Sequence, residues 1–203
     1  MTATATPATP STPATPAPTR TVHGAEVPVP GAYALDASHT HVGFVVRHLM
    51  IQKTRGRFPE VGGSIVVGDD PLESSVAVTI DTTGVDTGDE KRDAHLRSPD
   101  FFDVEQFPVM TYRSRQVREA GPGRWHVDGD LTIRDVTRPV ALEVRFDGAL
   151  VDPWGNTRAG FSASAEIDRN DFGLTWNQAL EGGGVLVSRT VTIEIEAEAV
   201  LGA

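Results

Sequence analysis

The residues best suited to chemistry are the histidines and a short charged segment between residues 87 and 99. His39 and His41 are two positions apart, so on a strand their rings would lie on one face. Imidazole is a common zinc ligand, but the chain has no cysteine and no His-Glu-x-x-His pattern. We therefore expect no metal site, and disulfides and thiolate chemistry are excluded.

The charged segment brings together a cation (Arg92), an acid (Asp93) and a base (His95). Neighbouring residues on a helix point about 100° apart, so Arg92 and Asp93 diverge while Arg92 and His95 share a face. We interpret this group as a structural network in which Asp93 pairs with Arg97, because ion pairs that support a fold also cluster charges.

A third candidate is Arg169-Asn-Asp-Phe-Gly173, which contains the Asp-Phe-Gly sequence of a kinase metal loop. The chain lacks the Gly-rich phosphate loop and the catalytic-loop aspartate that accompany it. We expect Asp171 and Gly173 to be turn residues and Phe172 to be an apolar plug. No nucleophile elbow or paired carboxylates are apparent, so we do not expect an enzyme.

Most of the chain after Gly31 alternates apolar and polar residues with a period of two, which predicts strands with one apolar face. We count about eight such segments, joined by short turn-rich connections. The pattern predicts a mainly β, antiparallel barrel or sandwich. The clearest segments are Val76–Ile80, Trp125–Ile133, Val140–Phe146, Phe161–Ile167 and Thr190–Ala199.

One segment breaks this rhythm and predicts a short helix. Thr87 and Glu90 have the spacing of a capping box, and Pro99 ends the segment. Leu96 would then face the barrel. Residues 99–107 predict a further turn, so we expect one or two short helices.

The N-terminal 30 residues differ in composition from the rest. They contain seven of the fourteen prolines, together with eight threonines and six alanines. Such a segment favours an extended, flexible chain. We expect residues 1–30 to be a disordered tail and residues 31–203 to be the folded domain. The tail has no basic start and no apolar stretch, so we expect no secretory signal and a cytoplasmic protein.

The overall charge restricts the partners. The net charge of −10 and the pI near 5.0 argue against nucleic acid and against a surface rich in anionic lipid. No apolar run approaches the length of about 20 residues that a helix needs to span a bilayer. We expect no integral membrane segment.

The blocks of sequence along the strands resemble the YceI-like family, and the resemblance extends from about residue 32 to residue 199. The order and spacing of the blocks carry the resemblance, because no single block is specific. The blocks are Leu35-Asp-Ala-Ser-His39-Thr-His-Val-Gly-Phe44 with His48, Arg55-Gly-Arg-Phe58, Thr87-Gly-Asp-Glu-Lys-Arg92-Asp93-Ala-His95-Leu96, Phe101-Phe-Asp103 with Phe107-Pro108, Gly129-Asp-Leu131-Thr-Ile-Arg-Asp-Val-Thr-Arg138-Pro139-Val140 and Arg169-Asn-Asp171-Phe172-Gly173.

The resemblance implies a lipocalin-like barrel that holds an isoprenoid lipid, such as a polyprenyl chain or an isoprenoid quinone, and it carries no catalytic set. Two features depart from the family pattern. Asp135 stands where the family usually has glycine, and many relatives carry a secretory signal that this sequence lacks. The expected partner is an isoprenoid lipid, and no other cofactor is expected. The sequence leaves a homodimer open.

The strand alternation selects the residues that would line an apolar channel, although the same residues would also fill a packed barrel. The expected liners are Phe44, Val78, Ile80, Leu131, Ile133, Leu142, Val144, Phe161, Ala163, Ile193 and Ile195. Polar residues at the mouth, or in a structural network, are expected to be His39, His48, Arg92, Asp93, His95, Arg169 and Asp171.

Two other functions stay open on the sequence alone. One is an enzyme for a small apolar substrate that uses His39, Arg92 and His95 at the barrel mouth. The other is an interaction domain whose N-terminal tail docks a partner.

Overall fold

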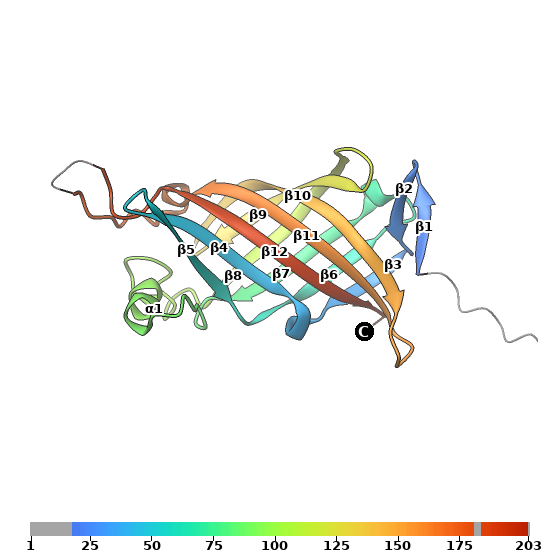
Figure 1. The fold of residues 1–203 in the computed structure, drawn as a ribbon, viewed down its shortest axis with the longest axis horizontal. Helices are drawn as coiled ribbons and strands as arrows, with labels where there is room; N and C mark the ends of the chain where they lie inside the picture. The colour runs from blue at the N-terminus through green and yellow to red at the C-terminus, as the bar shows by residue number, and fades with distance from the viewer. Residues whose placement is uncertain (1–17, 181–183, 203) are drawn as a thin grey trace, which may run out of the picture.

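A computed structural model describes residues 18–180 and 184–202, and in this part of the chain strands dominate (Figure 1). The strands are β1 Thr19–Val22, β2 Ala25–Pro28, β3 Gly31–Leu35, β4 His41–His48, β5 Gln52–Phe58, β6 Val61–Val67, β7 Ser75–Asp81, β8 Val109–Glu119, β9 Arg124–Ile133, β10 Val136–Val151, β11 Thr157–Asp168 and β12 Thr190–Leu201. The helices are α1 Glu90–Arg97 and the short 3-10 helices η1 Ala37–His39, η2 Pro71–Glu73 and η3 Arg169–Phe172.

The main sheet closes on itself. Its strands follow the order β11-β10-β9-β8-β7-β6-β3-β12, and β11 also pairs with β12, from Arg158 opposite Val200 to Asp168 opposite Thr190. Every pairing in this ring is antiparallel. The prediction of a mainly β, closed antiparallel barrel of eight strands is confirmed.

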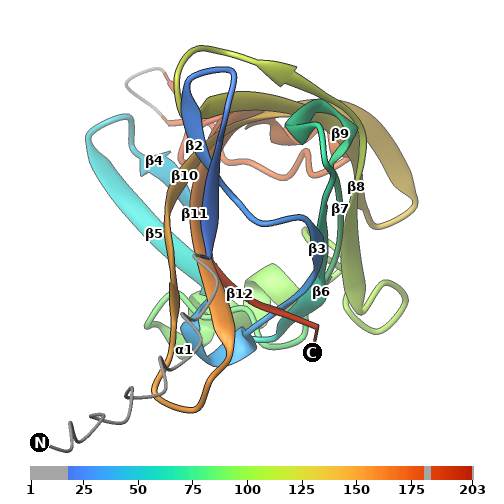
Figure 2. The ribbon, with the colours of Figure 1, turned by 90° about the vertical axis from the view of Figure 1, so that its right-hand side faces the viewer.

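Strand β12 has two partners on its other side, one after the other. Its C-terminal part pairs with β3, and residues 192–196 pair with β4. Strand β4 pairs in turn with β5, so this hairpin extends the wall toward the end of the barrel that carries α1 (Figure 1). The other end carries the hairpin β1–β2 (Figures 1 and 2).

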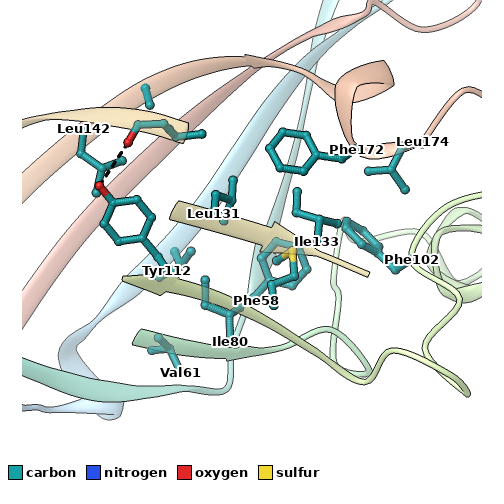
Figure 3. Packing of buried hydrophobic residues seen from close by; sticks show 14 of the residues in the cluster. Phe58, Val61, Ile80, Phe102, Tyr112, Leu131, Ile133, Leu142, Phe172 and Leu174 are labelled. Carbon is teal, nitrogen blue, oxygen red and sulfur yellow. Dashed lines mark hydrogen bonds between the residues drawn. The ribbon is translucent and has the colours of Figure 1, made fainter. Parts of the chain in front are cut away.

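The wall of the barrel is packed tightly around Tyr112 (Figure 3). The Tyr112 hydroxyl donates to the carbonyl oxygens of Val127 (2.7 Å) and Val140 (3.2 Å). Burial raises the pKa of Tyr112, and the charges of Asp128 and Asp130 raise it further. A Cβ at Gly129 would lie 2.5 Å from Cζ of Tyr112. The absent side chain of Gly129 therefore makes room for the Tyr112 ring.

Helix α1 begins two residues later than the capping box predicts. Its N-cap is Asp89, whose carboxylate accepts from the backbone N–H groups of Lys91 and Arg92. Thr87 instead donates its backbone N–H and its hydroxyl to Asp93. The prediction of Thr87 as a cap was wrong because the buried Asp93 carboxylate takes up the threonine.

The expected pair between Asp93 and Arg97 is also absent among the described residues. The Arg97 guanidinium donates to the carbonyl oxygens of Thr83 and Val85. Both side chains of the predicted pair thus form hydrogen bonds with the loop that precedes α1. They fix this loop to the helix, and the two side chains do not pair with each other.

The folded part begins earlier than expected. Strands β1 and β2 form a hairpin within the segment interpreted as a tail, with His23 and Gly24 at positive φ in the turn. The Arg20 guanidinium donates to the carbonyl oxygens of Gly68 and Asp69, and Val27 is buried. The boundary at residue 31 was therefore wrong for residues 19–28, and residues 1–17 lie outside the described part.

Helices contribute little to the fold. Among the described residues, no helix combines the length and apolar character needed to cross a membrane.

Candidate ligand cavity

The barrel encloses an elongated cavity of about 680 Å³. This volume lies within the range of about 300 to 1,000 Å³ that is usual for small-molecule sites. Its lining extends from Val27 and Pro28 of β2 at one end of the barrel to Arg92 and His95 of α1 at the other. The cavity therefore follows the long axis of the barrel.

All of the expected apolar liners contribute to the wall of this cavity. Because side chains alternate across a strand, the period-two pattern fixes which residues share the inner face. The residues in question are Phe44, Val78, Ile80, Leu131, Ile133, Leu142, Val144, Phe161, Ala163, Ile193 and Ile195. Their contact with a ligand stays a prediction.

The expected polar residues divide into two groups. His48, Arg92, His95 and Arg169 line the cavity. The other three do not line it. Asp93 of α1 is buried and accepts from Thr87, and Asp171 is an exposed residue of η3. His39 belongs to a separate cluster.

The cavity reaches solvent at the α1 end. Among its lining residues, those with exposed side chains are His48 at the end of β4 and Asp89, Lys91 and Arg92 at the start of α1. At the opposite end the lining residues Val27 and Pro28 are buried, and the β1–β2 hairpin lies beside the barrel opening (Figure 2). The α1 end is therefore the mouth.

Aromatic rings gather beside the mouth. The His95 ring makes T-shaped contacts with Phe101, at 5.1 Å between centroids, and with Trp176, at 4.5 Å. His95 Nε2 lies 2.9 Å from a carboxylate oxygen of Asp100. This arrangement fixes the imidazole between an apolar wall and a carboxylate.

Arg169 is a buried cation beneath this mouth, with 4% of its surface exposed. Its guanidinium donates to the carbonyl oxygens of Ser188 and Leu174 and lies 6.0 Å from the centroid of the Phe101 ring. Burial lowers the pKa of Arg169, and the charge of Asp168 acts in the opposite direction. Arg169 thus ties η3 to the residue after the Gly173 turn and to the segment just before β12.

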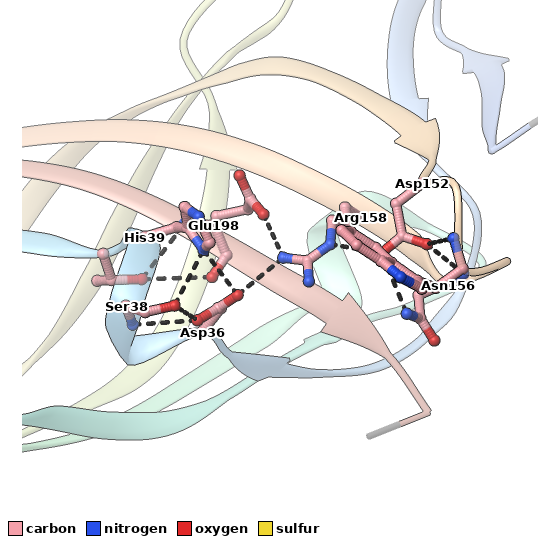
Figure 4. Close-up of polar contacts among 9 residues, drawn as sticks. Asp36, Ser38, His39, Asp152, Asn156, Arg158 and Glu198 are labelled. Atoms are coloured by element: carbon pink, nitrogen blue, oxygen red, sulfur yellow. Dashed lines mark hydrogen bonds and ion pairs between the residues drawn. The ribbon is translucent and has the colours of Figure 1, made fainter.

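His39 ends η1 and lies beside Glu198 of β12 (Figure 4), and it does not line the cavity that Arg92 and His95 line. Its Nδ1 atom is 2.9 Å from Asp36. Asp36 also accepts from Arg158 Nη1 at 2.8 Å, and Arg158 Nε donates to Asp152 at 2.8 Å. Glu198 accepts from the same guanidinium. The structure therefore does not bring His39 together with Arg92 and His95, and the enzyme site left open as an alternative is not assembled.

Two carboxylates of this cluster, Asp36 and Asp152, have lowered pKa values. Hydrogen bonds from Ser38 and then Arg158 keep the pKa of Asp36 well below its usual range. The hydrogen bond from Arg158 does the same for the pKa of Asp152, while these carboxylates raise the pKa of Arg158.

Three of these residues also offer ligand atoms for a metal. The ligand atoms of Asp36, His39 and Glu198 lie within 4.8 Å of one another. Arg158 already donates to both carboxylates and supplies the balancing positive charge. The cluster is therefore a latch that joins the β3–β4 connection, the β10–β11 turn and β12.

Sequence reasoning missed the part of the mouth that lies in irregular segments. Trp176, Leu186 and Val187 line the cavity but belong to the connection between η3 and β12, where no period exists. Val27 and Pro28 were missed because their segment was interpreted as disordered. The alternation of Ala25 and Val27 directly after the His23-Gly24 turn was the available signal.

Taken together, a closed antiparallel wall and an apolar interior with one polar mouth define a barrel of the ligand-binding type. The chain belongs to the family of the YceI-like domain, whose model matches residues 33–199.

The relatives agree with this assignment. A UPF0312 protein of Vibrio cholerae is 37% identical over 147 residues, which cover 70% of this chain and 77% of the relative. The Campylobacter jejuni YCEI protein is 27% identical, with a TM-score of 0.67 over 77% of this chain and 90% of its own. A polyisoprenoid binding domain from Saccharophagus degradans shares the fold at 17% identity, with a TM-score of 0.65 over 84% of this chain and 99% of its own.

Proposed function

We propose that this protein binds a long apolar lipid of the isoprenoid class inside its barrel. The observation that carries the proposal is the elongated apolar cavity of about 680 Å³ with exposed polar residues at its α1 end. A further support is that a protein of the same fold is described as a polyisoprenoid binding domain.

Burial of apolar surface is sufficient to drive such binding. Each buried CH₂ group contributes about 0.8 kcal/mol, so a chain of about 20 carbons has a gross gain on the order of 15 kcal/mol. The loss of translational and conformational freedom offsets part of this gain. The remainder supports tight binding without any charged contact in the cavity.

The distribution of polar residues gives the bound lipid a direction. The half of the cavity near β2 is lined by residues such as Val27, Val67 and Phe146, which suit a hydrocarbon tail. The head group then lies near His48, Arg92 and His95, where hydrogen-bond donors meet solvent. The depth of the cavity selects the chain length, and these polar residues select the head group.

The test is native mass spectrometry of the protein purified gently from its own host, followed by organic extraction and identification of the released molecule. The proposal predicts a stoichiometric polyprenyl chain or isoprenoid quinone. A protein that carries no lipid and does not take up a polyprenyl alcohol or a quinone when these are supplied would contradict it.

Two variants on neighbouring positions of β11 make the test specific for the cavity. Ala163 lines the cavity, and Ser164 is exposed and absent from its lining. Ala163→Trp fills the middle of the cavity and should abolish lipid uptake. Ser164→Trp adds the same ring outside and should leave uptake unchanged. Equal uptake by both variants would place the lipid elsewhere.

A further inference from the structure

The turn between β4 and β5 exposes three large apolar side chains at the mouth end of the barrel. Leu49, Met50 and Ile51, which we call the tip, are exposed by 38%, 53% and 74%. The tip projects from the same end of the barrel as α1 (Figure 1). It follows directly after His48, which lines the cavity mouth. An apolar surface thus lies beside the route into the cavity.

The backbone of the tip makes this choice of residues unexpected. Leu49 and Met50 have φ angles of 52° and 59°, in the left-handed region. Such turns strongly favour asparagine and glycine, because larger side chains there are strained. The turn is nevertheless held by two backbone hydrogen bonds. The Ile51 N–H donates to the carbonyl oxygen of His48, and the Leu49 N–H donates to the carbonyl oxygen of Leu186. A rigid turn therefore presents apolar side chains at a conformational cost that asparagine and glycine would avoid.

The hairpin that carries the tip is basic in an acidic protein. Residues 41–59 contain Arg47, Lys53, Arg55 and Arg57 but no aspartate or glutamate, whereas the chain as a whole has a net charge of −10. Thr54 and Val46 line the cavity, so the alternating Arg47, Lys53 and Arg55 face outward.

The basic residues closest to the tip are also the ones that lack partners. Arg57 pairs with Asp86 at 3.0 Å, and Arg55 lies 3.9 Å from Glu194. Arg47 and Lys53 face each other across the hairpin, and within residues 18–180 and 184–202 neither forms an ion pair. Positive charge thus increases toward the tip.

We propose that the tip inserts into the surface of a bilayer that contains anionic lipids, with Arg47 and Lys53 contacting the head groups. Apolar residues that enter the interface, backed by basic residues, are the combination that holds a protein on such a surface. The net charge opposes this docking, but charges far from the surface are screened within about 10 Å at moderate ionic strength. The basic residues of the hairpin therefore act most strongly on the head groups next to the tip.

Docking in this orientation brings the cavity mouth against the bilayer. An apolar lipid then passes between bilayer and barrel without crossing water. This last step rests on the function proposed above, whereas the docking itself does not.

The experiment is cosedimentation of the full chain with vesicles. Phosphatidylcholine vesicles with phosphatidylglycerol should bind the protein, and added salt should weaken the binding. Ile51→Asp should reduce the partition coefficient by at least about tenfold, because a charge replaces the most exposed apolar residue of the tip. Lys53→Gln should reduce it by about fivefold, which corresponds to one basic residue at an anionic surface.

The matched control is Leu150→Asp, because Leu150 is a large apolar residue of β10 that is 57% exposed near the opposite end of the barrel. It should bind vesicles like the wild type. Equal binding by Ile51→Asp and the wild type would overturn the proposal, and so would equal binding to vesicles of phosphatidylcholine alone. Absence of vesicle binding together with dimers that Ile51→Asp dissociates would assign the tip to self-association and overturn it as well.

The outcome is separable from that of the proposed function. Ile51→Asp purified from the host should still contain lipid if the cavity binds it. Vesicle binding by a protein whose cavity takes up no lipid would overturn the proposed function and support the docking.

Discussion

The two ends of the barrel are built differently. At the β1–β2 end, Tyr33 and Ala199 have no exposed surface, Ala159 has 1%, and Arg158 ties three chain segments together. At the α1 end, exposed polar residues line the cavity and the tip carries exposed apolar side chains. Tight packing and charge-assisted hydrogen bonds stabilise the first end. The second end is more exposed, and solvent reaches the cavity there. The difference indicates where stability and binding can be changed separately.

The largest difference between the ends should appear when a large side chain is truncated. Tyr33→Ala should lower the free energy of unfolding by about 3 to 5 kcal/mol, because a buried ring is lost from a packed site. Ile51→Ala at the tip should change it by no more than about 0.5 kcal/mol, since the side chain is exposed. Urea unfolding measures both values.

A conservative control separates packing from hydrogen bonding at Tyr33. The hydroxyl donates to the carbonyl oxygen of Val29 at 2.8 Å, so Tyr33→Phe should cost only about 1 kcal/mol. Similar costs for Tyr33→Ala and Ile51→Ala would show that the two ends do not differ in packing.

The second test adds volume to small residues. Ala199→Leu should cost about 1 to 3 kcal/mol, because Ala199 has no exposed surface and contacts a filled core. Ala163→Leu should cost less, because its side chain enters the cavity. Thermal unfolding of the two variants compares the available space. A greater loss for Ala163→Leu would contradict the position of the cavity.

The third test removes the latch. Arg158→Leu leaves the carboxylates of Asp36, Asp152 and Glu198 without their shared cation, so Tm should fall, though by less than in Tyr33→Ala. Lipid uptake should be retained, because Arg158 does not line the cavity. Differential scanning calorimetry and a lipid-uptake assay measure the two effects. Loss of uptake in a folded Arg158→Leu protein would contradict the separation of the ends.

The latch also predicts the response to acid. The folded protein holds the pKa values of Asp36 and Asp152 below those of the unfolded chain, which lie near about 3.9. Their contribution to stability is therefore complete above about pH 4 and decreases as the pH falls through the folded pKa values. The acid-induced fall in Tm should be smaller in Arg158→Leu. An identical fall in both proteins would show that other carboxylates determine it.

Only a small effect on stability is expected for His95→Gln. The His95 and Asp100 side chains are 37% and 52% exposed, and a hydrogen bond between groups this exposed contributes no more than about 1 kcal/mol. The change should instead alter which head groups bind, while the preferred chain length stays the same. A competition assay with prenyl alcohols and quinones tests this. A changed chain-length preference would contradict the position of the head group beside His95.

The regular parts of this fold could be predicted from the sequence, because the pattern that defines them is local. Strand alternation identified the inner face, and residues as far apart as Phe44 and Ile195 both line the cavity. The turn residues Asp171 and Gly173 and the buried Phe172 also follow from local chemistry, and Gly173 has a φ of 76°. A period of two specifies the face of a strand wherever one face is buried.

The latch could not be predicted in the same way. Asp36 and Arg158 are 122 positions apart, and Arg158 and Glu198 are 40 apart. They meet only because of the register between β11 and β12 and the path of the chain after β3. The role of Gly129 was hidden for a similar reason, because the ring that occupies its space comes from another strand.

The most direct test of lipid binding inside the barrel is a crystal structure of the protein purified from its own host with its lipid retained. Continuous electron density is expected along the barrel, with the tail near Val27 and Val67 and the head group beside His48 and His95. A head group at the β1–β2 end, or a barrel interior filled by rearranged side chains, would contradict it.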